Sequence, residues 1–398
     1  MADAVLALNA GSSSLKFAVW RDEAGLVIPV SKGEIEEIGA APHFIARDTS
    51  GVILIEKRWP SATFSFLVNE LLGWVDHHLG GGHLAAVGHR VVHGGQDHIR
   101  PERLTDGVVA ALEALTPLAP LHQPHCLAPI RAILASRPDL PQVACFDTAF
   151  HHTMPAVAAR FALPRAYEEE GVRHYGFHGL SYEYIARRLR EVAPNLASGR
   201  VVVAHLGNGA SLCAMSNGRG VDTTMTFTAL DGLMMGTRCG TLDPGVILYM
   251  LRRKNLSPDE IEHVLYEKSG LLGVSGLSGD MRVLLASDHA HAREAIELFV
   301  WRIARETAAM AMSLGGLDGF VFTAGIGEHA PDIRAAVCER LSWLGVKIAT
   351  GNPAMAAGRI SAPDSRVDVR VIATDEEAMI GQHTLDVLAA GAAWEGLG

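Results

Sequence analysis

The chain has 398 residues, of which 48% are hydrophobic and 20% are charged, and its formal net charge at pH 7 is −10. This length can hold two domains with separate hydrophobic cores. The negative net charge argues against general binding to nucleic acid or to a membrane surface. Nearly all of the basic residues are Arg, which suits bidentate contacts to carboxylate and phosphate.

Targeting and redox signals are weak. The N-terminus has no basic region, and its short apolar run stops at Asn9, so we expect no export signal. The best candidate for a membrane span, residues 308–327, contains Asp318 and several glycines. The five cysteines are scattered and predict reduced thiols, with neither a disulfide framework nor a Cys-based zinc site. We therefore expect a cytoplasmic protein that binds no membrane.

The first predicted element is a hairpin. Residues 5–8 and 17–20 are apolar strands, and residues 9–14 form a small polar turn that includes Gly11 and Ser12. Backbone N–H groups of such a turn can converge on an anion, and Lys16 adds a positive charge. This pattern suggests a phosphate-binding hairpin, with an ordinary Ser-rich turn as the alternative. It is not a Walker A loop, because no Gly-Lys-Ser/Thr occurs in the chain.

Strands and helices then alternate. Residues 86–92 and 142–146 read as buried strands, and residues 105–115 read as a helix. The carboxyl ends of such strands are where α/β proteins place ligand groups, which draws attention to Arg90 and Asp147. Residues 155–175 are weakly patterned and suit a lid or a domain junction. His122 and His125 have a spacing that could hold zinc, but no matching second pair is evident.

The second half opens like the first. Residues 201–206 form a predicted strand that enters the turn Gly207-Asn208-Gly209, and Ala204 and Ser211 align with Ala7 and Ser14. This similarity suggests that one α/β domain has been duplicated. Helices are expected at 182–191 and 294–314, strands at 320–323 and 369–373, and a final helix through residue 389. The turns at 207–209 and 325–327 lack the third glycine of a dinucleotide-binding fingerprint.

Charged residues beside strand ends and glycines are the other candidates. Arg238 lies between Gly236 and Gly240, where an Arg side chain can point into a cleft. Asp147 and Glu376 follow predicted strands, and a carboxylate there can bind Mg²⁺ directly or through water. The alternative for both carboxylates is helix N-capping.

Taken together, these segments resemble the acetate/propionate kinase family. The matching segments run in order over essentially the whole chain: residues 9–17, 88–95, 119–122, 146–151, 175–179, 205–211, 235–238, 325–328 and the Glu pair at 376. The resemblance implies an α/β fold of two duplicated ribonuclease-H-like domains, as in sugar kinases, actin and Hsp70, with a nucleotide cleft between them. We expect residues 1–148, completed by the C-terminal helix 376–398, to form one domain and residues 149–375 the other.

The resemblance also implies an activity: reversible, Mg²⁺-dependent transfer of a phosphoryl group from ATP to acetate, giving ADP and acetyl phosphate. Mn²⁺ is expected to substitute for Mg²⁺, and a homodimer is implied. Alternatives are a propionate or short-chain fatty acid kinase, a non-catalytic ATP switch on the same fold, and a regulatory pseudo-kinase.

Site residues follow by the same resemblance. Those implied for catalysis are Asp147, His178, Arg238 and His122. Those implied for the carboxylate and methyl group of acetate are Arg90, Val92, Leu121, Phe177 and Ala229. Those implied for ATP are Ser12, Lys16, His205, Leu206, Gly207, Asn208, Gly209, Asp280, Met281, Arg282, Gly325, Ile326, Gly327, Glu328 and His329, and those implied for the metal are Asn9 and Glu376.

Six positions depart from the usual pattern of that family. Leu180 and Tyr182 stand where Thr and His are usual, and Ala229 stands where Pro is usual. The segment after Arg238 reads Cys-Gly-Thr, ending at Thr241, instead of Ser-Gly-Asp, and Asp375 replaces Asn. The main charged residues are retained, so activity is expected.

Overall fold

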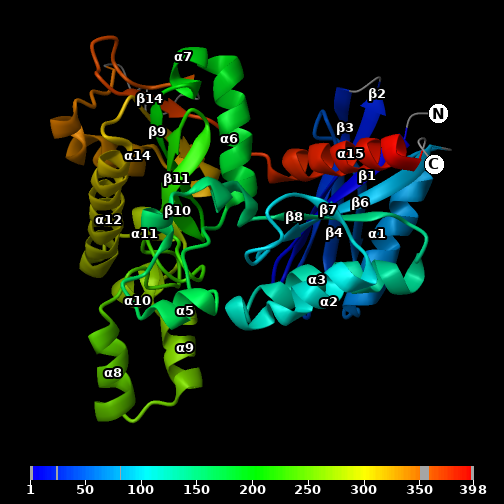
Figure 1. Cartoon of the computed structure of the whole chain (residues 1–398), viewed down its shortest axis with the longest axis horizontal. Helices are drawn as coiled ribbons and strands as arrows, with labels where there is room; N and C mark the ends of the chain where they lie inside the picture. Colours follow the sequence, from blue (N-terminus) through cyan, green and yellow to red (C-terminus); the bar gives the residue numbers. More distant parts are fainter. Residues whose placement is uncertain (1–2, 24–25, 81, 350–357, 396–398) are drawn as a thin grey trace. The chain divides into compact units, whose positions relative to one another are not determined.

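The structure, a computed structural model, describes residues 3–23, 26–80, 82–349 and 358–395. Two compact units make up the chain: residues 1–149 with 375–398, and residues 150–374 (Figure 1). From the sequence, the domain boundaries are expected after residues 148 and 375. Residues 396–398 of the expected final helix lie outside the described residues.

The first unit is built on an eight-stranded mixed sheet. Its strands are β1 (Asp3–Ala10), β2 (Leu15–Glu23), β3 (Leu26–Glu36), β4 (His43–Asp48), β5 (Ile53–Arg58), β6 (His83–Val91), β7 (Glu102–Arg103) and β8 (Gln142–Phe146). Their order is β5-β4-β3-β2-β1-β6-β8-β7. Strands β1, β6 and β8 run parallel, whereas β1 to β5 pair as antiparallel hairpins.

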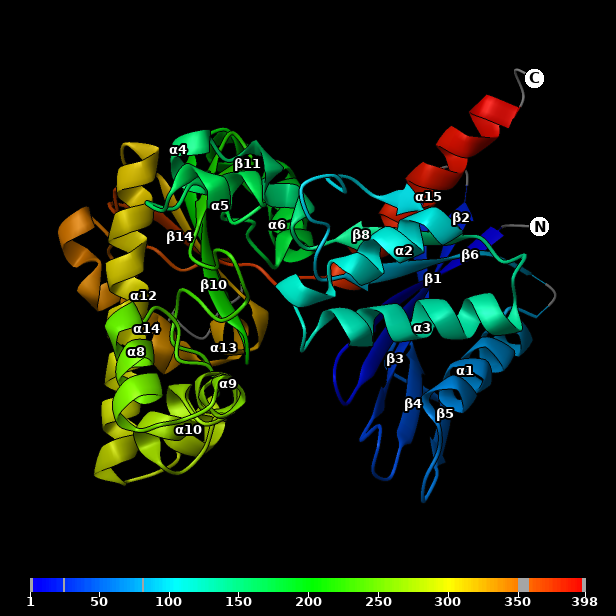
Figure 2. The ribbon, with the colours of Figure 1, turned by 60° about the horizontal axis from the view of Figure 1, so that its bottom comes forward.

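Helices cover both faces of this sheet. The helices α1 (Phe64–His78), α2 (Asp106–Ala114) and α3 (Gln123–Ser136) lie on one side, and α15 (Glu376–Glu395) crosses the other (Figure 2). Alternate residues of β1, such as Leu6 and Leu8, join Leu71 of α1 in one buried cluster, as period-two alternation requires. Gly88 lets α15 approach β6, because a Cβ at this position would lie 2.0 Å from Thr384 Oγ1.

The second unit is built on a six-stranded sheet. Its strands are β9 (Arg200–Leu206), β10 (Ala210–Ser216), β11 (Arg219–Thr223), β12 (Gly319–Thr323), β13 (Gly358–Arg359) and β14 (Asp368–Val371), in the order β11-β10-β9-β12-β14-β13. Helix α6 (Gly179–Val192) packs on one face, where Tyr182 and Ile185 meet Val201 and Val203. Helix α12 (Ala290–Leu314) packs on the opposite face (Figure 1).

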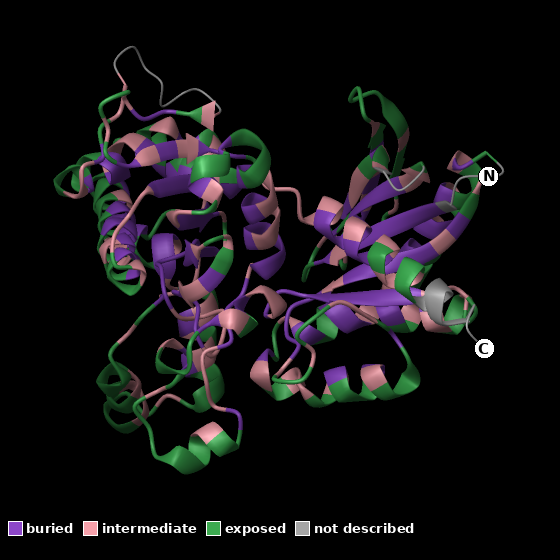
Figure 3. Ribbon diagram, turned by 45° about the horizontal axis from the view of Figure 1, so that its top comes forward, coloured by how far each residue is buried: buried purple, intermediate pink, exposed green. Residues whose placement is uncertain are grey.

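Shorter helices complete the second unit. They are α4 (Ala156–Ala159), α5 (Arg165–Glu169), α7 (Pro194–Ala197), α8 (Pro244–Arg253), α9 (Pro258–Glu267), α10 (Gly270–Ser275), α11 (Met281–Leu285), α13 (Ala324–His329) and α14 (Pro331–Arg340). Short 3₁₀ helices lie at 116–118 in the first unit, at 149–153 where the first unit meets the second in sequence, and at 342–344 in the second unit. Burial concentrates along the strands of each sheet (Figure 3).

The two sheets repeat one topology. Each sheet contains three antiparallel strands followed by two strands parallel to the third. These five strands are β3-β2-β1-β6-β8 in the first unit and β11-β10-β9-β12-β14 in the second. The predicted fold of two ribonuclease-H-like domains is therefore confirmed. In the sequence alignment of the two hairpins, Ala10 and Leu15, which pair in the first hairpin, correspond to Gly207 and Leu212. In the structure, however, the last pair before the second turn is Leu206 with Ala210. The turn of the second hairpin is shorter, so the repeat holds for the topology and not residue by residue.

All five cysteines are free, as predicted. Across the described ranges, no helix is long and apolar enough to cross a membrane.

Candidate active site

The first cluster of expected site residues lies in the first unit, at the carboxyl ends of three neighbouring parallel strands. Asn9 lies near the end of β1, Arg90 near the end of β6, and Asp147 directly after β8. Arg90 donates from Nε and Nη2 to Asp147 Oδ2, at 3.0 and 2.5 Å, and from Nη1 to Asn9 Oδ1 at 3.2 Å. The end of such a sheet is a usual place for ligands.

The first turn of α15 adds two carboxylates to this cluster. Asn9 Nδ2 donates to Glu376 Oε2 at 3.1 Å and to Glu377 Oε1 at 3.2 Å. Glu377 was not among the expected site residues, although the sequence signal, a second acidic residue in the first turn, was visible. Helix α15 begins here, so its N-terminal N–H groups also favour negative charge.

The electrostatics of this cluster are unbalanced. The pKa of Glu376 is raised to about 7, mainly by burial and also by Asp147 and Glu377, while Arg90 acts in the opposite direction. Burial opposes the charge of Arg90, but Asp147 and Glu376 outweigh it, so the pKa of Arg90 is raised. Asp147 is fully buried, and its Oδ1 has no hydrogen-bond partner. The cluster therefore holds more negative than positive charge and an unsatisfied carboxylate oxygen.

The second cluster lies in the second unit, around the turn between β9 and β10. His178 precedes α6 with a φ of 58°, a left-handed conformation that is uncommon outside Gly. Its Nδ1 lies 2.8 Å from Ser211 Oγ, and its ring stacks on that of His205 with centroids 4.1 Å apart. The carbonyl of Phe177 accepts a hydrogen bond from His151 Nε2 at 2.9 Å, which fixes the backbone beside His178.

Arg238 reaches the same turn. A Cβ on Gly209 would lie 2.8 Å from Arg238 Nη2 and 3.2 Å from His178 Nε2, so both nitrogens lie against the Cα of Gly209. Arg238 Nη1 donates to the carbonyl of Ala229 at 2.6 Å. The guanidinium is thus held by a backbone oxygen, and two N–H-bearing side chains meet over one glycine.

Close glycine contacts join the segments expected to bind ATP. Gly236 N donates to Asn208 O at 3.1 Å, and a Cβ on Gly236 would clash with Asn208. Gly279 lies against Gly236, since its Cβ would stand 2.9 Å from the Gly236 carbonyl oxygen. The turn at 207–209, the loop at 235–238 and the segment before α11 therefore lie together. At α11, Asp280 caps the helix and pairs with Arg282 at 2.6 Å.

Helix α13 completes this group. Gly207 lies near Ala324, with its Cβ position 3.9 Å from the Ala324 Cβ. Glu328 Oε1 accepts from the N–H groups of Ala324 and Thr374, at 2.8 and 3.2 Å, so this side chain holds backbone. Arg334, which is 1% exposed, donates to the carbonyls of Gly327 and Glu328. Arg334 was not singled out from the sequence, where it reads as an ordinary helical Arg.

Comparison with known proteins decides the family. The sequence profile of the Acetokinase family matches residues 4–382. The chain belongs to this acetokinase family. An acetate kinase from Rhodopseudomonas palustris is 55% identical over 389 residues, 96% of this chain and 98% of that protein. An acetate kinase from Rhizobium meliloti is 47% identical, covering 98% of this chain and 99% of that protein.

Solved structures agree. The crystal structure of a propionate kinase from Francisella tularensis subsp. tularensis is similar with a TM-score of 0.89 and 36% identity, covering 96% of this chain and 98% of that one. That of Porphyromonas gingivalis acetate kinase is similar with a TM-score of 0.84 and 36% identity, covering 97% and 100%. The predicted family resemblance is therefore confirmed.

The remaining expected residues of this acetokinase-family chain are distributed over both units. Val92 is buried and Leu121 exposed in the first unit, whereas Phe177 is buried and Ala229 half-buried in the second. In the first hairpin Ser12 and Lys16 are exposed. Leu206 and Met281 are buried, and Gly325, Ile326 and His329 form α13. His122 precedes α3 and is half-buried.

No group of three or more His, Cys, Asp or Glu side chains in the described ranges is arranged to hold a metal ion. The zinc alternative at His122 and His125 thus gains no support.

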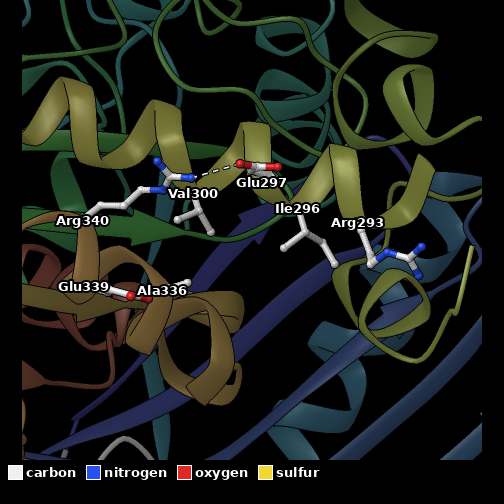
Figure 4. A pocket seen from close by; sticks show the side chains of 7 residues that line it. All are labelled: Arg293, Ile296, Glu297, Val300, Ala336, Glu339 and Arg340. Carbon is white, nitrogen blue, oxygen red and sulfur yellow. Dashed lines mark hydrogen bonds and ion pairs between the residues drawn. The ribbon is translucent and has the colours of Figure 1, made fainter. Parts of the chain in front are cut away.

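A cavity of about 500 Å³ lies away from these residues, between α12 and α14. Figure 4 shows its lining, which consists of Arg293, Ile296, Glu297, Val300, Ala336, Glu339 and Arg340. Arg340 pairs with Glu297 at 3.3 Å across it. None of the expected site residues lines this cavity.

Proposed function

We propose that this chain is an acetate kinase, which transfers the γ-phosphoryl group of ATP reversibly to acetate and gives ADP and acetyl phosphate. The observation that carries the proposal is the meeting of Arg238 Nη2 and His178 Nε2 over Gly209, in the turn expected to bind phosphate. High identity to named acetate kinases over nearly the full length supports the choice of substrates.

The chemical task is to bring an anionic carboxylate to an anionic phosphate. Phosphoryl transfer depends mainly on in-line positioning and on stabilising the charge of the equatorial oxygens. Arg238 and His178 supply N–H donors for those oxygens. The negative oxygens of the transferring phosphoryl group need hydrogen-bond donors that are already in place. The Ala229 carbonyl holds Arg238, and the Ser211 hydroxyl holds His178.

Arg90 is the proposed carboxylate binder. Of its five N–H groups, three donate to Asp147 and Asn9, which leaves two for a substrate carboxylate. Acetate is ionised near neutral pH, because carboxylic acids titrate near pH ~4 to 5. It has no proton for a base to remove, so we infer that Asp147 orients Arg90 and metal-bound water instead of acting as an acid or base.

The first cluster fits a divalent cation. Asn9, Glu376 and the unsatisfied Oδ1 of Asp147 would hold Mg²⁺, or Mn²⁺ in its place, directly or through water. Mg²⁺ is usually bound by one or two carboxylates plus substrate phosphates and water, so a complete protein cage is not expected. The metal would neutralise charge on the phosphates of ATP.

One assay separates the proposed function from its alternatives. The protein is incubated with ATP, Mg²⁺ and acetate, and acetyl phosphate is trapped with hydroxylamine. An acetate kinase gives acetate-dependent hydroxamate. A non-catalytic ATP switch binds ATP but gives none, and a pseudo-kinase gives none at any acetate concentration.

A propionate or short-chain fatty acid kinase remains the second candidate. It is favoured by the structural similarity to a propionate kinase and by Ala229, which is smaller than the Pro usual in the family. Propionate and butyrate in the same assay rank the three acids directly.

We also propose that the protein is a homodimer and that α8 lies in its interface. This helix reads Pro-Gly-Val-Ile-Leu-Tyr-Met-Leu-Arg-Arg, yet it has no buried residue. Val246, Leu248 and Tyr249 are 36%, 47% and 52% exposed. Such a run of large apolar side chains typically marks an interaction surface. Sedimentation of Tyr249→Asp should give monomer, whereas Val52→Asp, an exposed position in the other unit, should leave the dimer intact.

A further inference from the structure

The hydroxyl of Tyr182 forms the start of a buried hydrogen-bonded chain that ends on His178. Tyr182 lies in the first turn of α6, is fully buried, and has its OH 2.5 Å from Ser211 Oγ. Ser211 Oγ in turn lies 2.8 Å from His178 Nδ1. Ser211 is also fully buried, in β10, so the helix fixes the start of this hydrogen-bonded chain and the strand fixes its middle.

We propose that Tyr182, acting through Ser211, is a positioning residue that orients the His178 ring and keeps its Nδ1 unprotonated, so that Nε2 carries the hydrogen. The inference rests on the proposed function for its catalytic consequence, but the tautomer itself can be observed without turnover.

The direction of the chain follows from counting hydrogens. Among the described residues, the hydrogen-bond partner of the Tyr182 hydroxyl is Ser211 Oγ. If Tyr182 donates to Ser211, then Ser211 donates to His178 Nδ1. Both hydroxyl hydrogens then have an acceptor, and Nδ1 has a donor. If His178 Nδ1–H donated instead, Ser211 would either donate to Tyr182 or accept from it as well, and a buried hydroxyl hydrogen, that of Tyr182 or that of Ser211, would have no acceptor in this network. Leaving such a donor buried and unpaired costs its full desolvation penalty, which selects the first direction.

Two neighbouring features agree with this direction. Burial raises the pKa of Tyr182 well above its usual value, so the hydroxyl stays a donor at physiological pH. The ring of His205 stacks on that of His178 with an angle of 14° between the planes, and His205 Nδ1 has its own partner in Ser181 Oγ at 2.8 Å. Two positive imidazoliums stacked in this way would repel, so the stacking disfavours a positive charge on both rings at once.

The consequence concerns the nitrogen that faces Gly209. With Nδ1 accepting from Ser211, Nε2–H is the donor next to Arg238 Nη2. Which nitrogen of a histidine carries the proton is set by the hydrogen bond that the other nitrogen makes. Tyr182 stands at a position where the family usually has His. Its hydroxyl is the donor that begins the hydrogen-bonded path to His178.

The test combines turnover with the tautomer of His178. Protein labelled with ¹⁵N-histidine is examined by NMR, with the His178→Gln spectrum assigning the signal, and hydroxamate formation is measured in parallel. In the parent, Nε2 should be protonated and Nδ1 should not. Tyr182→Phe should raise the fraction protonated at Nδ1 and lower turnover about 3- to 10-fold, the range of one hydrogen bond. The Michaelis constants for ATP and acetate should stay within about twofold, since substrate contacts are unchanged.

Ser211→Ala and the double variant test whether Tyr182 acts through Ser211. In the Ser211→Ala background, the further change Tyr182→Phe should alter neither the tautomer nor turnover, because the connection is already cut. Tyr175→Phe is the matched control: it removes the hydroxyl of another buried tyrosine, whose OH donates to Gly171 O at 2.7 Å. It should change neither readout.

Each outcome has a definite meaning. Protonation of Nδ1 in the parent, or an unchanged tautomer and turnover in folded Tyr182→Phe, overturns the inference, as does an additive double variant. If the parent makes no acetyl phosphate while Tyr182→Phe still shifts the tautomer, then the proposed function fails and the positioning role stands.

Discussion

Arg90 donates two of its N–H groups to a single oxygen of Asp147, at 3.0 and 2.5 Å, and the other oxygen of that buried carboxylate is left without a partner. Asp147 therefore both anchors a guanidinium and keeps a vacant acceptor.

The change Asp147→Asn should remove the charge that holds Arg90. Hydrogen bonds to charged groups contribute about 1.5–3 kcal/mol, so the Michaelis constant for acetate should rise by roughly tenfold or more. Affinity for Mg²⁺ with ATP, followed by calorimetry, should fall as well. Loss of turnover with both affinities intact would instead support an acid or base role for Asp147.

Arg238 and Arg90 should differ in the step they affect. Arg238→Ala should lower turnover by roughly 10³-fold or more, as for other arginines that stabilise a transferring phosphoryl group. Arg90→Ala should also raise the Michaelis constant for acetate. Steady-state kinetics of both variants decide the matter, with Arg160→Ala, an exposed arginine paired with Glu168, as the control. Equal effects on acetate affinity with little loss of turnover would contradict the assignment.

Gly209 is the position where Arg238 and His178, the two side chains proposed to face the phosphate, leave no room for a Cβ. The added methyl of Gly209→Ala would lie 2.8 Å from Arg238 Nη2, so it should displace the guanidinium and lower turnover by roughly 10²-fold, the cost of losing one preorganised donor. Gly73→Ala in α1 is the matched control, since its methyl meets no atom within 4 Å. A fully active Gly209→Ala protein would show that Arg238 does not act at this point.

Acid should destabilise the protein through His151. Burial lowers its pKa from 6.5 to about 4, against the hydrogen bond to Phe177 O, and its Nδ1 has no partner. Because the folded pKa lies below the unfolded one, the stabilising contribution is complete above pH 6.5 and is lost as the pH falls toward 4. Its upper limit is about 3 kcal/mol, at about 1.4 kcal/mol per pKa unit.

The comparison that isolates this effect is His151→Asn against His152→Asn, because His152 is the exposed neighbour. Unfolding midpoints measured from pH 7 to pH 4 should fall less steeply in His151→Asn than in the parent, while His152→Asn should follow the parent. Parallel curves for all three proteins would show that His151 does not carry the acid sensitivity.

The sequence predicts the parts of the fold and site that depend on local pattern. The strand-turn-strand segments at 5–20 and 201–212 can be predicted because apolar runs flank Gly-rich turns. Asp147 can be singled out because it directly follows the apolar run Val-Ala-Cys-Phe. The hydrogen-bond partners of the site residues cannot be predicted from the local sequence, because they come from distant segments. The bond from Asn9 to Glu376 joins residues 367 positions apart, and the path from Tyr182 through Ser211 to His178 needs the packing of α6 on β10.

Substrate size should depend on Ala229. One methylene in an apolar pocket is worth about 1–3 kcal/mol, so discrimination between acetate and propionate is intrinsically modest. We expect acetate to be preferred, propionate to be accepted with reduced efficiency, and butyrate to be poor. Ala229→Pro should sharpen the preference for acetate by adding ring volume. Proline keeps the carbonyl that accepts from Arg238 Nη1, but it fixes φ, so the prediction applies where the backbone at residue 229 adopts the proline geometry.

The measurement is kcat/KM for the three acids in the parent and in Ala229→Pro. To separate a change in the acid-binding pocket from general damage to the protein, the variant must keep its unfolding midpoint and its Michaelis constant for ATP. If propionate or butyrate exceeds acetate in the parent, the acetate assignment fails in favour of a longer-chain acid. If folded Ala229→Pro leaves the ratios unchanged, then residue 229 acts only through the carbonyl that holds Arg238, and its side chain does not border the methyl group of the substrate.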